Sequence, residues 1–72
     1  MSKEANRIMS NCARIPGWHG TASKQEVNEI LESCGGEIMC NGHLREFEFT
    51  MITPEMYSFK TVNWYDKHRG GK

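Results

Sequence analysis

The dipeptide Asn41-Gly42 constrains the fold of this chain more than any other feature of its sequence. Asn-Gly is the strongest short-range signal for a two-residue β-hairpin turn, because both residues tolerate positive φ angles. Residues 37–40 before it and 43–52 after it read as strands, and the second strand alternates apolar with polar side chains. Its apolar positions are Phe47, Phe49 and Met51. We therefore predict an antiparallel hairpin with one buried face.

Two helices are predicted before the hairpin. Within residues 5–13, apolar side chains recur at the spacing of one helical face, and Ser2 is available as the N-cap. The stretch "RIPG" ends this helix, because proline disfavours helical geometry in the residue before it. A second helix starts with the capping box of Ser23 and Glu26 and stops at a pair of glycines, Gly35-Gly36.

A third strand is predicted over residues 57–66, after a turn at residues 53–55. The expected fold is α+β, with two N-terminal helices packed on one face of a three-stranded antiparallel meander in the order ααβββ. Residues 1–66 would form this single small domain. Residues 67–72, a polar stretch, would form a flexible C-terminal tail.

Charge and hydropathy argue against two classes of partner, nucleic acid and membranes. Nine Lys and Arg residues balance nine Asp and Glu residues, whereas proteins dedicated to nucleic acid usually carry a clear basic excess. No apolar run approaches the about 18 residues of a membrane span, so no membrane partner is expected. The N-terminal stretch lacks the apolar core of a signal peptide, and three cysteines cannot form a complete disulfide framework. We expect a cytoplasmic protein.

A zinc site is the first chemical alternative to be weighed. Cys40 and His43 flank the hairpin turn and should face each other on neighbouring strands, and Cys34 lies six residues before Cys40. Structural zinc sites usually present two closely spaced ligand pairs, and the sequence shows only one. Cys34 is already explained as the last residue of a helical apolar stripe. We therefore predict neither a metal nor another cofactor.

Catalysis is the second alternative. A reactive cysteine needs a helix N-terminus or a cationic neighbour, but Cys34 lies at a helix C-terminus, where the dipole disfavours a thiolate. Cys40 and His43 have no obvious acid to orient them. A loop histidine such as His19 is more often solvated than catalytic. The sequence therefore predicts a protein that is not an enzyme.

The third strand is ambiguous because its large side chains do not share one parity. If Tyr57 and Phe59 face the helices, Val62 and Trp64 face solvent on the second side of the sheet. A β-bulge that sends all of them inward is the alternative interpretation. An exposed apolar patch with a charged rim is typical of a protein-binding surface. The candidate partner-binding residues are Trp64, Val62, Tyr65, Tyr57 and Trp18.

The sequence thus favours a small non-enzymatic protein-interaction module, such as an adaptor, inhibitor or regulator of the kind common among bacterial and phage accessory proteins. Its partner would be another protein, bound through the aromatic face of the sheet, and a homodimer through the same face is a variant of this hypothesis. The alternative is a nucleic-acid-binding regulator, with or without a structural zinc.

Overall fold

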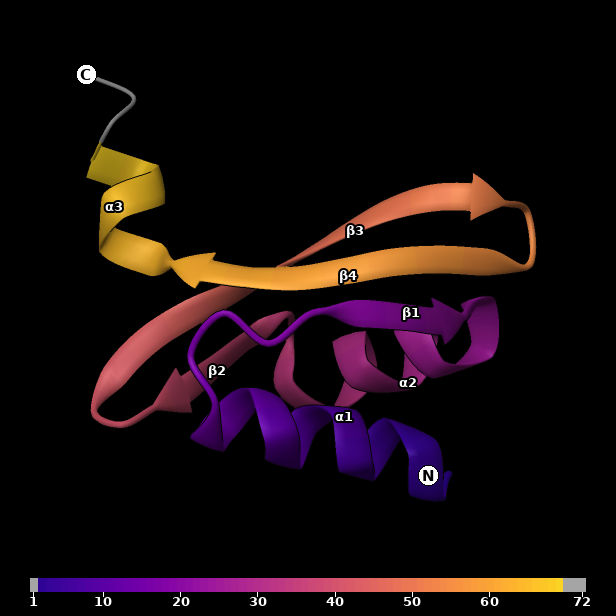
Figure 1. The fold of residues 1–72 in the computed structure, drawn as a ribbon, viewed down its shortest axis with the longest axis horizontal. Helices are drawn as coiled ribbons and strands as arrows, with labels where there is room; N and C mark the ends of the chain where they lie inside the picture. Colours follow the sequence, from indigo (N-terminus) through magenta and orange to yellow (C-terminus); the bar gives the residue numbers. More distant parts are fainter. Residues whose placement is uncertain (1, 70–72) are drawn as a thin grey trace.

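The computed structural model describes residues 2–69. It shows an antiparallel sheet with two helices on one side and a short third helix at the far end of the last strand (Figure 1). The elements follow one another as α1 (Lys3–Arg14), β1 (Gly20–Ser23), α2 (Lys24–Cys34), β2 (Glu37–Cys40), β3 (His43–Thr53), β4 (Met56–Asn63) and α3 (Trp64–Arg69). The α+β class is as predicted.

The sheet has four strands in the order β1-β4-β3-β2, so the prediction of a three-stranded meander after both helices was wrong. The additional strand, β1, lies between the two helices in sequence and pairs with the far edge of β4, where Gly20 faces Phe59 and Ala22 faces Tyr57. Of its four residues, Gly, Thr, Ala and Ser, only Thr21 favours a strand. Pairing with β4 therefore makes this segment a strand.

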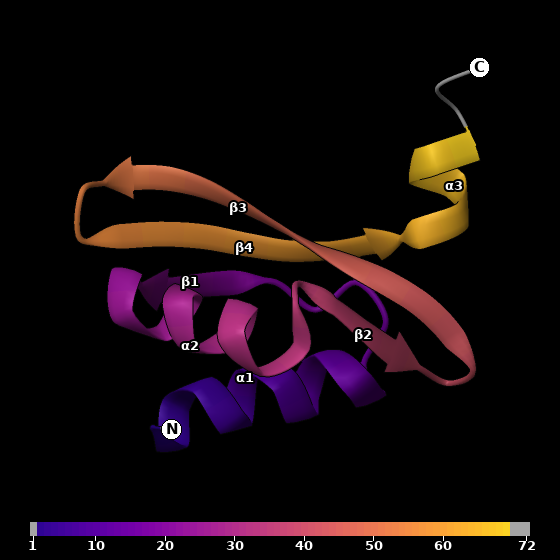
Figure 2. The ribbon, with the colours of Figure 1, turned by 180° about the vertical axis from the view of Figure 1, so that it is seen from behind.

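The helices begin and end where the sequence predicted. Ser2 caps α1, and both bonds of the capping box between Ser23 and Glu26 are present at the start of α2. Gly35 ends α2 in the left-handed conformation. The carboxylate of Glu29 accepts hydrogen bonds from the backbone and the hydroxyl of Ser2, which joins the start of α1 to α2. Seen from behind, α2 lies in front of β1, and α1 runs beneath both (Figure 2).

The hairpin turn at Asn41-Gly42 is also as predicted. Both residues have positive φ, 53° and 84°, and Cys40 pairs with His43 across the turn. These angles fit a two-residue turn whose twist matches that of the strands.

One face of the sheet forms the core with α1 and α2. Phe47 and Phe59 are buried on this face, and Phe49 and Tyr57 pack against the same cluster. The pairing of β3 with β4 is unbroken from Arg45 and Asn63 to Met51 and Tyr57, so no bulge changes the parity of β4. The interpretation that a bulge turns Val62 inward was therefore wrong. The irregularity lies between Met51 and Thr53, beside the turn. The fully buried members of the core include Ala5, Ile8, Cys12 and Ile30.

The last strand is shorter than predicted. It ends at Asn63, and residues 64–69 form α3, so the expected strand over residues 57–66 was wrong at its C-terminal end. The side-chain oxygen of Asn63 accepts a hydrogen bond from the backbone N–H of Asp66, which is the geometry of a helix N-cap. Of the predicted tail at residues 67–72, residues 67–69 belong to α3 and residues 70–72 lie outside the described residues.

The core makes a direct stability prediction. Ile30 is fully buried, so Ile30→Ala should lower the free energy of unfolding by about 2–5 kcal/mol through lost burial and a residual cavity. The adjacent Leu31 is 44% exposed, and Leu31→Ala is the matched control, with an expected loss under about 1 kcal/mol. Urea denaturation followed by circular dichroism measures both. Equal losses would contradict this placement of α2.

Candidate protein-binding surfaces

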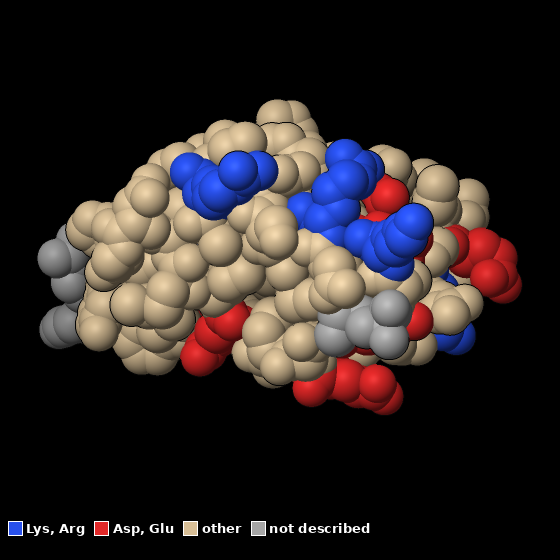
Figure 3. Space-filling view, turned by 90° about the horizontal axis from the view of Figure 1, so that it is seen from below, with Lys and Arg blue, Asp and Glu red and all other residues tan. Residues whose placement is uncertain are grey.

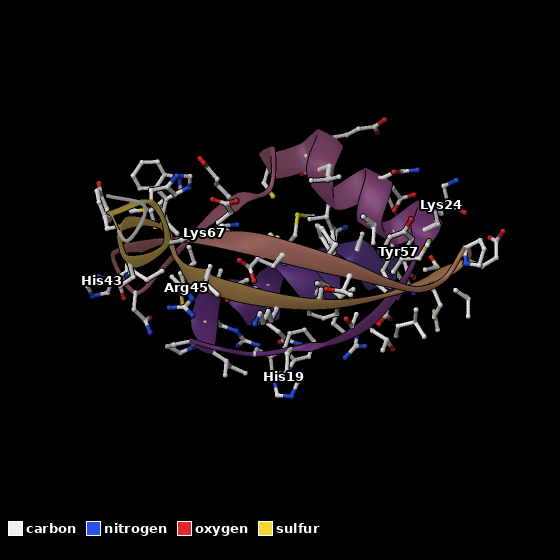
Figure 4. All side chains as sticks on the ribbon, turned by 90° about the horizontal axis from the view of Figure 1, so that it is seen from above. His19, Lys24, His43, Arg45, Tyr57 and Lys67 are labelled. Atoms are coloured by element: carbon white, nitrogen blue, oxygen red, sulfur yellow. The ribbon has the colours of Figure 1, made fainter. Side chains whose placement is uncertain are left out.

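Two of the five candidate anchors are part of the helix-side layer. Trp18 lies with its ring centroid 5.5 Å from that of Phe59, and Tyr57 packs against the same core. Both rings therefore stabilise the fold, and only their exposed parts could contact a partner. Figure 4 shows Tyr57 at the opposite end of the sheet from Lys67 of α3.

The other three candidates lie close together at the end of β4 and in α3. Val62 pairs with Glu46, on the face of the sheet that points away from α1 and α2. In α3, the ring of Trp64 meets that of Tyr65 edge-on at 5.2 Å and stacks on His68 at 4.1 Å. Tyr65 is 64% exposed, whereas Val62 and Trp64 are half-buried.

Charged side chains on the same outer face of the sheet hold α3. Lys67 lies 2.9 Å from a carboxylate oxygen of Glu46 and 3.1 Å from one of Glu48. The imidazole of His68 lies 2.7 Å from the other oxygen of Glu46. On the neighbouring strand β2, Glu37 is the direct partner of Glu46. Two carboxylates facing each other across strands repel, so the ammonium of Lys67 offsets an unfavourable pair.

The pKa values in this group shift as the geometry requires. Hydrogen bonds from His68 first, and then from Lys67, hold the pKa of Glu46 below its usual range. Bonds to Glu46 and then to Glu48 raise the pKa of Lys67 above its usual value. Both shifts mean that the charged forms stabilise the docked position of α3.

A second surface lies where β3 and β4 meet, and the sequence did not single it out. We call Met51, Ile52 and Met56 the hairpin patch. The alternation of the strands places Met51 on the helix side and Met56 on the outer side, so these residues lie on both faces of this end of the sheet. Their side chains are 60%, 57% and 42% exposed. Met51 was expected on the core face. It is exposed because α2 packs against β1 and β4, which leaves the end of β3 without a helix above it. The alternation of apolar and polar residues in β3 indicates which face Met51 is on, but it does not indicate how much of that face the helices cover.

The candidate zinc ligands Cys34, Cys40 and His43 do not form a metal centre among residues 2–69. Cys40 and His43 are opposite each other as predicted, but Cys40 is buried and His43 is exposed. Within residues 2–69, no group of three or more His, Cys, Asp and Glu side chains is arranged to hold a metal ion. Cys12 is buried in the core, which raises the pKa of its thiol to about 11, far from the range of a reactive thiolate.

His19 borders a shallow hollow of about 370 Å³ together with Glu48 and Lys60. Its ring is exposed and projects away from the sheet on the β1 side (Figure 4). Its Nδ1 lies 3.4 Å from the backbone oxygen of Gly17. Among residues 2–69, the ring of His19 thus contacts a backbone oxygen and makes no hydrogen bond to a carboxylate, the usual partner of a catalytic histidine.

The helix side of the molecule carries charges of both signs. Seen from below, most of the Lys and Arg atoms in view lie along one side of this face, and most of the Asp and Glu atoms lie along the opposite side and at one end (Figure 3). None of the helices among residues 2–69 is long and apolar enough to cross a membrane. Comparison with family models, with curated proteins and with solved structures found no match to this chain.

The ion pairs predict an acid-sensitive α3. Because the pKa of Glu46 is depressed, its stabilising effect is complete above the ordinary carboxyl value of about 4.3 and is lost as the pH falls through the lower folded value. The backbone amide signals of Lys67 and His68 in NMR spectra should therefore move toward random-coil positions below about pH 4. Glu46→Gln should show part of this displacement already at pH 7, since the pair between Lys67 and Glu48 remains. Signals that stay unchanged from pH 7 to pH 3 would contradict the role of these pairs.

Proposed function

We propose that this protein is a non-enzymatic protein-interaction module that binds another protein through exposed apolar side chains. The observation that carries the proposal is the hairpin patch, three large apolar side chains that are all more than two-fifths exposed at one end of a domain of 8.3 kDa. Leaving apolar surface in water costs about 25 cal/mol per Å², so a partner that covers the patch gains that free energy.

The chemistry of the patch suits a protein partner. Methionine has a flexible, polarisable side chain that adapts to the shape of an apposed surface. Two of the three residues in the patch are methionines. The exposed Tyr65, with Trp64 and Val62 beside it, adds a second contact region, since aromatic residues often carry interface energy. These features support a binding role for the candidate anchors in and next to α3.

Other observations weigh against the alternatives. The cationic side chains of Lys60 and Lys67 lie beside Glu48, which reduces the attraction that phosphates would feel. Cys12 has a raised pKa and His19 has no orienting acid, which supports a protein without catalytic activity. The three cysteines are free thiols, which suits the cytoplasm, where thiols stay reduced. The alternative function, nucleic-acid binding, gains no specific support from these residues.

The proposal is tested by capturing partners on the immobilised full chain. The wild-type protein should capture a defined protein from native lysate, and Ile52→Lys combined with Met56→Lys should reduce that capture by about tenfold or more, as loss of a contact of over 1.4 kcal/mol would. Both side chains are exposed, so the substitutions remove no core packing. Thr53→Lys adds one positive charge between them without removing an apolar side chain and is the control for charge.

A homodimer is distinguished by sedimentation at several concentrations. If the hairpin patch joins two copies of the chain, the wild type will dimerise and the doubly substituted variant will not. The proposal fails if the wild type neither captures a partner nor self-associates, or if the double variant behaves like the wild type in both measurements.

A further inference from the structure

The outer face of the sheet already holds a helix. Lys67 spans two carboxylates of β3, and His68 reaches one of them from the next position of α3. Trp64 precedes Lys67 by three positions and His68 by four, and its ring stacks on His68. Residues at these spacings share one face of a helix. One face of α3 thus combines an aromatic ring with two basic groups, matching the acidic surface beneath it.

The surface beneath α3 has both components of a binding site. The side chains of Glu46 and Glu48 supply the negative charge. Val62, the pairing partner of Glu46, supplies an apolar side chain on the same face of the sheet. A hollow of about 500 Å³ lies beside α3 and is lined by Arg45, Glu48, Val62, Asn63, Asp66 and Lys67. Figure 4 shows Arg45 and Lys67 at the same end of the sheet.

The hold on α3 is weak in two respects. The helix has six residues, too few to be stable in water without its contacts to the sheet. Its ion pairs involve partly exposed side chains, and such pairs contribute little individually. No residue separates the end of β4 from the start of α3, so a change of backbone angles at Asn63 and Trp64 would move residues 64–69 off the sheet.

We propose that this surface, formed by Glu46, Glu48 and Val62, is a docking site for a helical segment of a partner protein. That segment carries an aromatic residue and a basic residue three or four positions apart. In the free protein α3 occupies the site as an intramolecular competitor. The inference rests on the proposed function, to which it adds a second surface and the chemistry of the partner.

Competition has a measurable consequence. An occupied site lowers the apparent affinity for an external helix by the fraction of molecules in which the site is open. Removing the contacts of α3 should therefore tighten binding of that helix. Removing the acidic side chains of the sheet should weaken binding, whether α3 is docked or not.

The probe is a synthetic peptide with the sequence NWYDKHR, which repeats residues 63–69, titrated into the isotope-labelled full chain and followed by NMR. The double variant Lys67→Ala, His68→Ala should bind it about tenfold more tightly than the wild type, as expected when a site that was about one-tenth open becomes fully open. Adding Glu46→Gln should reverse that gain. Glu55→Gln, the same change at the distant hairpin turn, is the matched control and should have no effect.

Two results overturn the proposal. One is unchanged affinity, meaning that the double variant binds the peptide no more tightly than the wild type, or that adding Glu46→Gln to the double variant does not weaken binding. The other is a concentration-dependent dimer of the wild type that the double variant abolishes, because the occupant would then be α3 of a second copy. Neither experiment touches the hairpin patch, so failure here and failure of partner capture through that patch are separate outcomes.

Discussion

The packing of Phe47 against Phe59 on the helix side of the sheet is the contact on which the rest of the structure depends. Their ring centroids lie 6.5 Å apart, Phe49 stacks on Phe47 at 5.5 Å, and Trp18 leans on Phe59. Successive side chains of a strand point to opposite faces. Burying these rings therefore fixes the face toward which each of the remaining side chains of β3 and β4 points. A shift of one residue would place the glutamates of β3 in the core.

The same constraint produces both candidate surfaces. With Phe47 inward, Glu46 and Glu48 must point outward, where their charges hold α3 and its aromatic rings. The two long helices cover only part of the inner face, since α2 lies against β1 and β4. The end of β3 is therefore left uncovered, and the hairpin patch is exposed there. The first surface carries charged side chains and contacts α3, and the second is made of exposed apolar side chains.

The parts predicted correctly from the sequence are those with a local physical cause. Ser2, the Ser23–Glu26 capping box and the Asn41-Gly42 turn act through bonds between near neighbours. Strand β1 depends on pairing partners that follow it by between 33 and 39 positions, and its sequence carries little local strand signal. The start of α3 did have a signal, Asn63 followed three residues later by Asp66, but the aromatic residues between them favoured a strand. Exposure of Met51 depends on how far a helix extends, which no local pattern encodes.

The most direct test of this account is a set of interstrand nuclear Overhauser effects measured on the full chain. The account predicts contacts between Phe49 and Phe59 and between Glu48 and Lys60, with further contacts joining Gly20 to Phe59 across the β1 edge. Contacts that instead join Phe49 to Lys60 would show a sheet shifted by one residue. That result would contradict the inward packing of the phenylalanines and, with it, the outward position of the glutamates that hold α3.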